Sequence, residues 1–145
     1  MTKEVFVRVA SYQTLDGDDD HMEIINTGTY YKKNDYHYVI YEEMMQGFDT
    51  PVKNMVKFKK GILTLNKKGI INTTMVLEEG CKSSCCYATP YGNVMLDMNT
   101  ESVEISEEEE KICIDAFYAL AANYEHLANC EIHIEITPKH CGIHI

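Results

Sequence analysis

Half of the tyrosines in this chain gather in one short stretch, on both sides of a turn signal at Asn34-Asp35. Tyrosine rings offer apolar area and their hydroxyls orient a bound molecule, so an interior lined by them would suit an amphipathic ligand. The same rings could instead pair across neighbouring strands and stabilise a sheet. Both interpretations stay open for the five clustered residues, which are Tyr30, Tyr31, Tyr36, Tyr38 and Tyr41.

A carboxylate and a lysine could complete such a site. Because side chains alternate along a strand, one of the neighbours Glu42 and Glu43 is expected to face inward. A buried carboxylate needs a cation, hydrogen-bond donors or a proton, and Lys67 or a tyrosine hydroxyl could serve. A satisfied structural pair is the simpler interpretation, and no catalytic residue is assigned. The residues expected to bind a ligand are Tyr31, Tyr38, Tyr41, Glu43, Lys67 and Tyr87.

Histidines and cysteines invite a metal interpretation that their spacing does not support. Glu131, His133 and Glu135 would share one face of a strand, with ~6.6 Å along the chain between neighbours. No CxxC pair is repeated at the spacing of a zinc site. We interpret the strand residues as the wet face of an outer strand, and expect no metal and no cofactor. The other donors considered are His140, Cys141 and His144 near the end of the chain, and Cys81, Cys85 and Cys86.

Familiar catalytic signatures are missing from the sequence. There is no GxSxG nucleophile elbow, and no GxGxxG or GxxxxGKS loop to bind phosphate. Six cysteines and six histidines leave a Cys–His pair open, although buried unreactive thiols are commoner than nucleophiles. No export signal is recognised at the N-terminus, so we expect reduced thiols and a cytoplasmic location.

Composition excludes several classes of protein. A chain of 145 residues suggests one domain, taken as residues 1–138 with a tail at 139–145. A net charge of −10 argues against a nucleic-acid partner, and no apolar run approaches the ~20 residues that cross a membrane. A lysine-rich middle segment, 53–82, could form a local positive patch, but lysines at solvent-facing strand positions explain it more simply.

Apolar residues recur with a period of two, which indicates strands rather than helices. Glycine-containing turns at short intervals between these runs are typical of an all-β meander, closed as a barrel or folded as a sandwich. The segment 111–122 is ambiguous, because Ser106 and Glu109 resemble a helix capping box. We expect strands near 3–14, 22–33, 36–46, 52–59, 62–67, 70–79, 81–89, 92–105, 111–122 and 130–138.

Three blocks together resemble the YwiB-like family, a bacterial domain of unknown function. They are GTYYKKNDYHYVIYEE (28–43), KKGIINTTMVLEEG (67–80) and CYATPYGNVMLDMNT (86–100). The resemblance implies a calycin-like, lipocalin-like antiparallel barrel of eight strands, and makes 111–122 and 130–138 its last hairpin. The chain departs from the family at Lys67, where members often carry an arginine, and lysine offers charge without a bidentate fork.

Three functions follow from these observations, in descending order of preference. The first is non-catalytic binding of a small hydrophobic or amphipathic ligand inside the barrel, since small barrels hold either packed side chains or one small ligand. The second is a protein-interaction or self-assembly module, such as a homodimer, that uses an outer face or a sheet edge. The third is a small-molecule enzyme, which would need titratable groups converging in one pocket.

Overall fold

Alternation of apolar and polar residues builds almost the whole chain into strands. The computed structural model describes residues 3–15 and 17–139, and these residues form ten strands. Along the last strand Ile132, Ile134 and Ile136 are buried, whereas His133 and Glu135 between them are partly exposed. The strands are β1 (Lys3–Leu15), β2 (Asp18–Lys33), β3 (Tyr36–Glu43), β4 (Val52–Lys59), β5 (Ile62–Lys68), β6 (Thr73–Glu78), β7 (Lys82–Thr89), β8 (Gly92–Glu107), β9 (Ile112–Ala122) and β10 (Glu125–Pro138).

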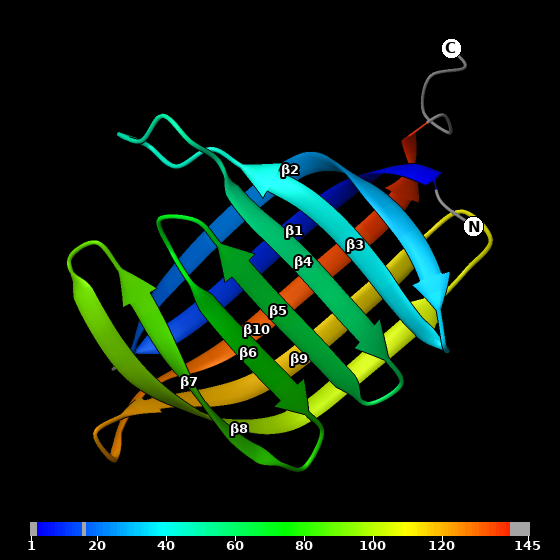
Figure 1. Ribbon diagram of the computed structural model, residues 1–145. Coiled ribbons are helices and arrows are strands. Elements are labelled where there is room, and N and C mark those ends of the chain that lie inside the picture. Colours follow the sequence, from blue (N-terminus) through cyan, green and yellow to red (C-terminus); the bar gives the residue numbers. More distant parts are fainter. Residues whose placement is uncertain (1–2, 16, 140–145) are drawn as a thin grey trace.

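All of these strands belong to one antiparallel sheet, in the order β6-β5-β4-β3-β2-β1-β10-β9-β8-β7. Each strand pairs with its neighbours in the chain, except that β1 also pairs with β10 and the sheet ends at β6 and β7. The sheet curls so that β3, β4 and β5 cross in front of β1, β10 and β9 (Figure 1). The meander expected from the sequence is confirmed.

The expected number of eight strands is wrong. That number came from the family resemblance, whereas the two-residue alternation itself predicted ten strands at nearly the observed places. Every alternating stretch has at least one antiparallel neighbour with which its backbone forms hydrogen bonds, so none is left as a loop.

The barrel is nearly closed between β6 and β7. One isolated bridge joins Asn72 to Ala88, through Asn72 N–H to Ala88 O at 2.9 Å and the reciprocal bond at 3.0 Å. Nearer the other end of this seam, the Ser83 hydroxyl on β7 donates to Val76 O on β6 at 2.6 Å. The seam is therefore bridged at two places but has no full ladder.

Two tight turns fix the register of the hairpins. Asn34 and Asp35 have φ angles of 52° and 69°, and Asn123 and Tyr124 have φ angles of 52° and 65°. Two consecutive residues with positive φ match the twist of a two-residue hairpin turn. The first turn was predicted. The second joins β9 to β10 and shows that the ambiguous segment 111–122 is a strand.

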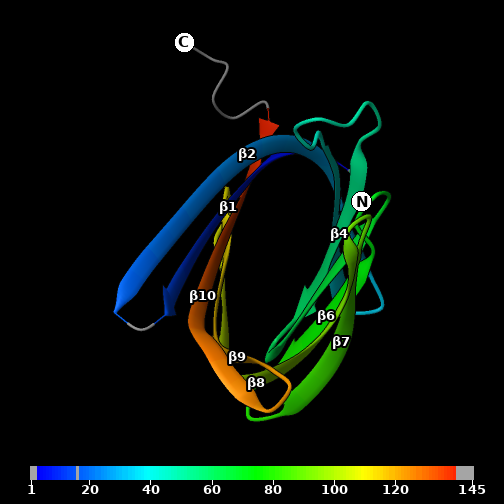
Figure 2. The same ribbon diagram turned by 90° about the vertical axis from the view of Figure 1, so that its left-hand side faces the viewer.

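The inner face of the sheet carries the core. Its largest fully buried side chains come from both walls of the barrel, which Figure 2 shows facing each other. No helix within the described ranges has the length and apolar character that crossing a membrane requires. The core side chains are Phe58, Leu63, Leu77, Met98, Ile114 and Ile134.

Candidate functional site

Four of the six residues expected to bind a ligand lie on the inner face. Tyr41 is opposite Asn54, and Asn54 is in turn opposite Lys67, so three neighbouring strands present these side chains in one row. Glu43 follows two residues after Tyr41 and therefore has the same orientation. Tyr87 on β7 is close enough to Glu43 to feel its charge. These four side chains therefore lie together on the inner face.

Lys67 and Glu43 form an ion pair inside this cluster. The Lys67 Nζ lies 3.1 Å from Glu43 Oε1 and 2.7 Å from Asn54 Oδ1. The Asn54 Nδ2 donates to Glu43 Oε1 and to Val52 O, both at 3.3 Å. The pair is the satisfied structural pair that the sequence suggested, because each charged group has its partner.

Burial moves the pKa values of the neighbouring phenols further above neutral pH. It raises the pKa of Tyr41, and the Glu43 charge raises that pKa further. Burial is also the main cause that raises the pKa of Tyr87, followed by Glu43 and Cys85. Both hydroxyls therefore remain available as hydrogen-bond donors at neutral pH.

Tyr31 and Tyr38 lie apart from this cluster, on the outer face. Their rings stack across the β2–β3 pair, with centroids 4.8 Å apart and planes 7° from parallel. Lys57 adds its ammonium group over the Tyr36 ring at 4.3 Å and the Tyr38 ring at 5.6 Å. These outer tyrosines match the alternative interpretation, in which aromatic rings stabilise the sheet.

A second polar group occupies the opposite end of the interior, and the sequence did not single it out. The Tyr30 hydroxyl lies 2.7 Å from His37 Nδ1, and His37 Nε2 lies 3.5 Å from Glu107 Oε1. The His37 ring stacks on Phe58 with centroids 4.7 Å apart. His37 stands two residues from the buried Val39, so its inward orientation was the signal that could have found it.

Burial controls the charge of His37. It lowers the pKa of the imidazole, against the opposing effect of the Glu107 carboxylate, and Lys32 lowers the pKa further. A neutral ring that accepts a hydrogen bond from the Tyr30 hydroxyl at Nδ1 carries its own proton at Nε2, directed at Glu107. This end can therefore offer a ligand an imidazole, a phenol and a carboxylate.

A pocket of about 100 Å³ opens beside this second group. Its apolar surface comes from Val5, Ile112 and Ile136, and Tyr30 and Glu107 contribute polar atoms. Such a volume exceeds the ~15 Å³ that one water molecule needs. The interior therefore retains space at this end.

The side chains that the sequence analysis considered as metal ligands, segment by segment, are arranged differently in the structure. His140, Cys141 and His144 lie outside the described residues. Cys85 is buried, whereas Cys81 and Cys86 are exposed, and the described cysteines are free thiols. Glu131, His133 and Glu135 share the outer face of β10 as predicted. Two of these three meet a side chain from β9, which the sequence did not indicate.

Comparison with known proteins places the chain in a family. A domain of unknown function, DUF1934, matches residues 7–134. The uncharacterized beta-barrel protein YwiB of Bacillus subtilis (strain 168) is 29% identical over 134 residues, which cover 90% of this chain and 92% of that protein. The crystal structure of the ywiB protein superposes with a TM-score of 0.84 at 23% identity, covering 94% and 92% of the two chains. The chain belongs to the DUF1934 family, as the sequence resemblance indicated.

Proposed function

We propose that this DUF1934 barrel binds a small amphipathic ligand without catalysis, in the manner of calycin-like barrels, at the end marked by Tyr30, His37 and Glu107. The observation that carries the proposal is the pocket beside Glu107, because it joins an apolar surface to a polar rim. Ligand sites have this composition, since apolar area supplies affinity and a few polar groups fix orientation.

Charge around the pocket favours a ligand with a cationic head group. Its lining includes the four glutamates 107–110 and only two lysines, Lys3 and Lys111. The Glu107 side chain is 55% exposed and can turn toward an incoming ammonium group. An alkyl amine would place its head group at Glu107 and its chain against Ile112 and Ile136.

The opposite end is the alternative place for a ligand. There the Lys67 ammonium already has Glu43 and Asn54 as partners, so an anionic head group would have to displace a carboxylate. Breaking a partly buried pair is costly unless the newcomer replaces the lost charge. An anionic ligand is therefore favoured less strongly than a cationic one.

Two matched probes distinguish the ends. We expect isothermal titration calorimetry to detect decylamine, used below its micelle concentration, more strongly than decanoate, which has the same chain and the opposite charge. Glu107→Gln should weaken decylamine binding about tenfold, which corresponds to the loss of roughly 1.4 kcal/mol from one charged contact. Glu101→Gln, an exposed change elsewhere on β8, is the matched control.

Native mass spectrometry of protein purified gently from its source cells complements the titration. An amphipathic amine that co-purifies would support the proposal directly. Decanoate binding that is lost in Lys67→Met but unchanged in Glu107→Gln would transfer the site to the other end. Absence of binding by either probe, together with no co-purifying molecule, would overturn ligand binding at both ends.

Self-assembly is the second candidate function, and one observation favours it. Strand β2 pairs with β1 from Asp18 to Tyr30 but with β3 only from Gly28 onward, so residues 18–27 have a strand partner on one side only in the described sheet. Met22 and Ile25 on this edge are each 63% exposed. A second copy pairing there would cover both.

Sedimentation velocity tests this assembly. Asp18, Asp19 and Asp20 on the edge would repel a second copy, so we expect association to strengthen as salt screens them. Ile25→Lys should abolish the dimer. A monomer at high protein concentration and high salt would contradict this candidate.

A further inference from the structure

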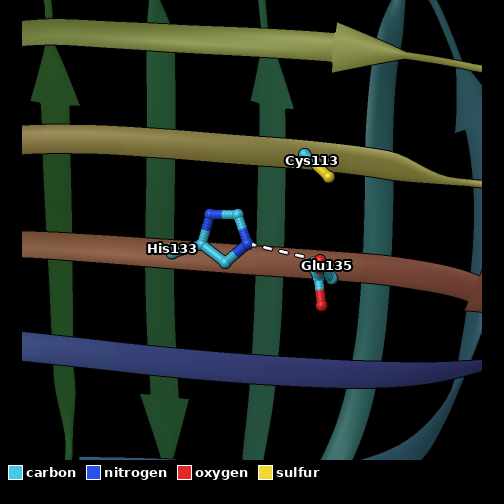
Figure 3. A group of neighbouring side chains, drawn as sticks. All are labelled: Cys113, His133 and Glu135. Atoms are coloured by element: carbon cyan, nitrogen blue, oxygen red, sulfur yellow. Dashed lines mark ion pairs between the residues drawn. The ribbon is translucent and has the colours of Figure 1, made fainter.

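Four chemically active side chains form a compact square on the outer face of β9 and β10. Cys113 lies directly opposite Glu135, and Asp115 lies directly opposite His133. The potential ligand atoms of Cys113, His133 and Glu135 all lie within 4.8 Å of one another. Figure 3 shows Cys113 on β9, and His133 and Glu135 side by side on β10. Paired strands therefore hold a thiol, an imidazole and a carboxylate in one place.

The orientation of His133 suits metal coordination. Its Nδ1 lies 2.6 Å from Asp115 Oδ1, which fixes the ring and leaves Nε2 toward Glu135 Oε1 at 3.5 Å. Histidines that bind metals commonly donate their other ring N–H to a carboxylate in this way. Asp115 is thus a positioning residue, and it distinguishes this group from a chance gathering of exposed side chains.

We propose that Cys113, His133 and Glu135 form a zinc site, with Asp115 orienting His133. Sulfur, nitrogen and oxygen donors are the set that Zn²⁺ prefers. Three protein ligands leave a fourth tetrahedral position for water, because the site faces solvent from the outside of the barrel. The site lies on the outer face of the barrel, and Lys111, which pairs with Glu135, also lines the proposed ligand pocket.

The side chains of Arg8 and Lys111 both contact the Glu135 carboxylate. Arg8 Nη1 lies 3.1 Å from Oε2, the oxygen turned away from His133, and so orients the carboxylate. Lys111 Nζ lies 3.4 Å from Oε1, the oxygen that faces His133. The Lys111 side chain is 42% exposed and can swing into solvent when a metal ion takes its place beside Oε1. Zn²⁺ would therefore take the place of the ammonium group, and its second positive charge would be balanced by the thiolate that forms when Cys113 releases its proton to solvent.

Cobalt and zinc titrations test the site in the full chain. His140→Ala, Cys141→Ser and His144→Ala are first combined in one background, so that these donors cannot bind the metal. Co²⁺ bound by a thiolate gives a charge-transfer band in the near ultraviolet, and Zn²⁺ should displace it. We expect one ion per chain in this background and loss of the band in Cys113→Ser.

Graded variants separate ligands from neighbours. His133→Ala and Glu135→Gln should each weaken zinc binding strongly, and Asp115→Asn should weaken it about 10–100-fold. Lys111→Met should strengthen it, since the competing ammonium group is gone. The matched control is Cys86→Ser, an exposed thiol on β7 that should leave binding unchanged.

Urea unfolding of each metal-free variant confirms that the fold is intact, which is expected because the site lies outside the core. Two results would overturn the proposal. One is full zinc affinity in both Cys113→Ser and His133→Ala, and the other is loss of the cobalt band in Cys86→Ser but not in Cys113→Ser.

Discussion

The two ends of the barrel interior contain similar groups in different states of completion. At one end Lys67, Glu43 and Asn54 bond to one another, and the lysine and glutamate side chains are only 29% and 19% exposed. At the other end His37 is buried but its partner Glu107 is 55% exposed, next to a pocket. The saturated network joins β3, β4 and β5 to one another, whereas the end with spare bonding capacity is the one we propose as the ligand site.

Removing the aromatic ring beneath His37 should have the largest effect on stability. Phe58 is fully buried and stacks on His37, so Phe58→Ala should lower the free energy of unfolding by about 3–5 kcal/mol. The matched control is Phe117→Ala, at a ring that is 38% exposed on the outer face, and it should lower the free energy of unfolding by less than about 1 kcal/mol. Urea denaturation measures both. Equal losses would mean that the His37 end is as loosely packed as the outer surface.

Breaking the saturated end should have the next largest effect. Lys67→Met leaves the Glu43 carboxylate and Asn54 without their cation and should cost about 2 kcal/mol of unfolding free energy. Adding Glu43→Gln should recover part of this loss, because the unpaired charge is removed. Glu107→Gln, at the open end, should change stability by less than about 0.5 kcal/mol. Identical costs at both ends would remove the contrast between them.

Removing one hydrogen bond at the open end should have a smaller effect. Tyr30→Phe deletes the hydroxyl that bonds His37 Nδ1 at 2.7 Å, and should cost about 1 kcal/mol. The variant His37→Phe in the same background should cost less than in the parent chain, because the two groups share one interaction. Additive costs in this double-mutant cycle, measured by urea unfolding, would show that the two side chains act independently.

The pH dependence of stability should show the smallest effect. Burial lowers the pKa of His37, so the unfolded chain binds its proton more readily than the folded chain does. The contribution of His37 to stability is therefore present above its unfolded pKa of about 6.5, and it declines as the pH falls toward the lower folded value. Thermal unfolding between pH 7.5 and 5.5 should show less decline in His37→Gln. An unchanged slope would place the cause in another residue.

Strand positions were predictable because two-residue alternation is a local property of the sequence. The Asn34-Asp35 turn and the burial of Ile132, Ile134 and Ile136 follow from it directly. The number of strands was correct when taken from alternation and wrong when taken from the resemblance. Local pattern was the better guide here, since each alternating stretch has a strand beside it.

The candidate sites were harder to predict, because alternation separates two faces without saying which one is inner. The expected site nevertheless included both Tyr38 and Tyr41, which alternation places on opposite faces; Tyr38 stacks outside and Tyr41 is buried. His37 was passed over although it shares the orientation of Tyr41. Cys113 could be joined to His133 and Glu135 only through the β9–β10 register, which depends on a turn at Asn123-Tyr124 that the sequence did not suggest.

Between β6 and β7 the barrel wall is a seam whose backbone is joined by the bridge between Asn72 and Ala88 rather than by a ladder. Parting it breaks two backbone hydrogen bonds, whereas parting β3 from β4 would break a whole ladder. Local opening should be most frequent along this seam, so the amide protons of Asn72 and Ala88 should exchange with solvent before those in the middle of β4. A ligand in the interior would then have a second route in and out, through the seam between β6 and β7 and separate from the pocket beside Glu107.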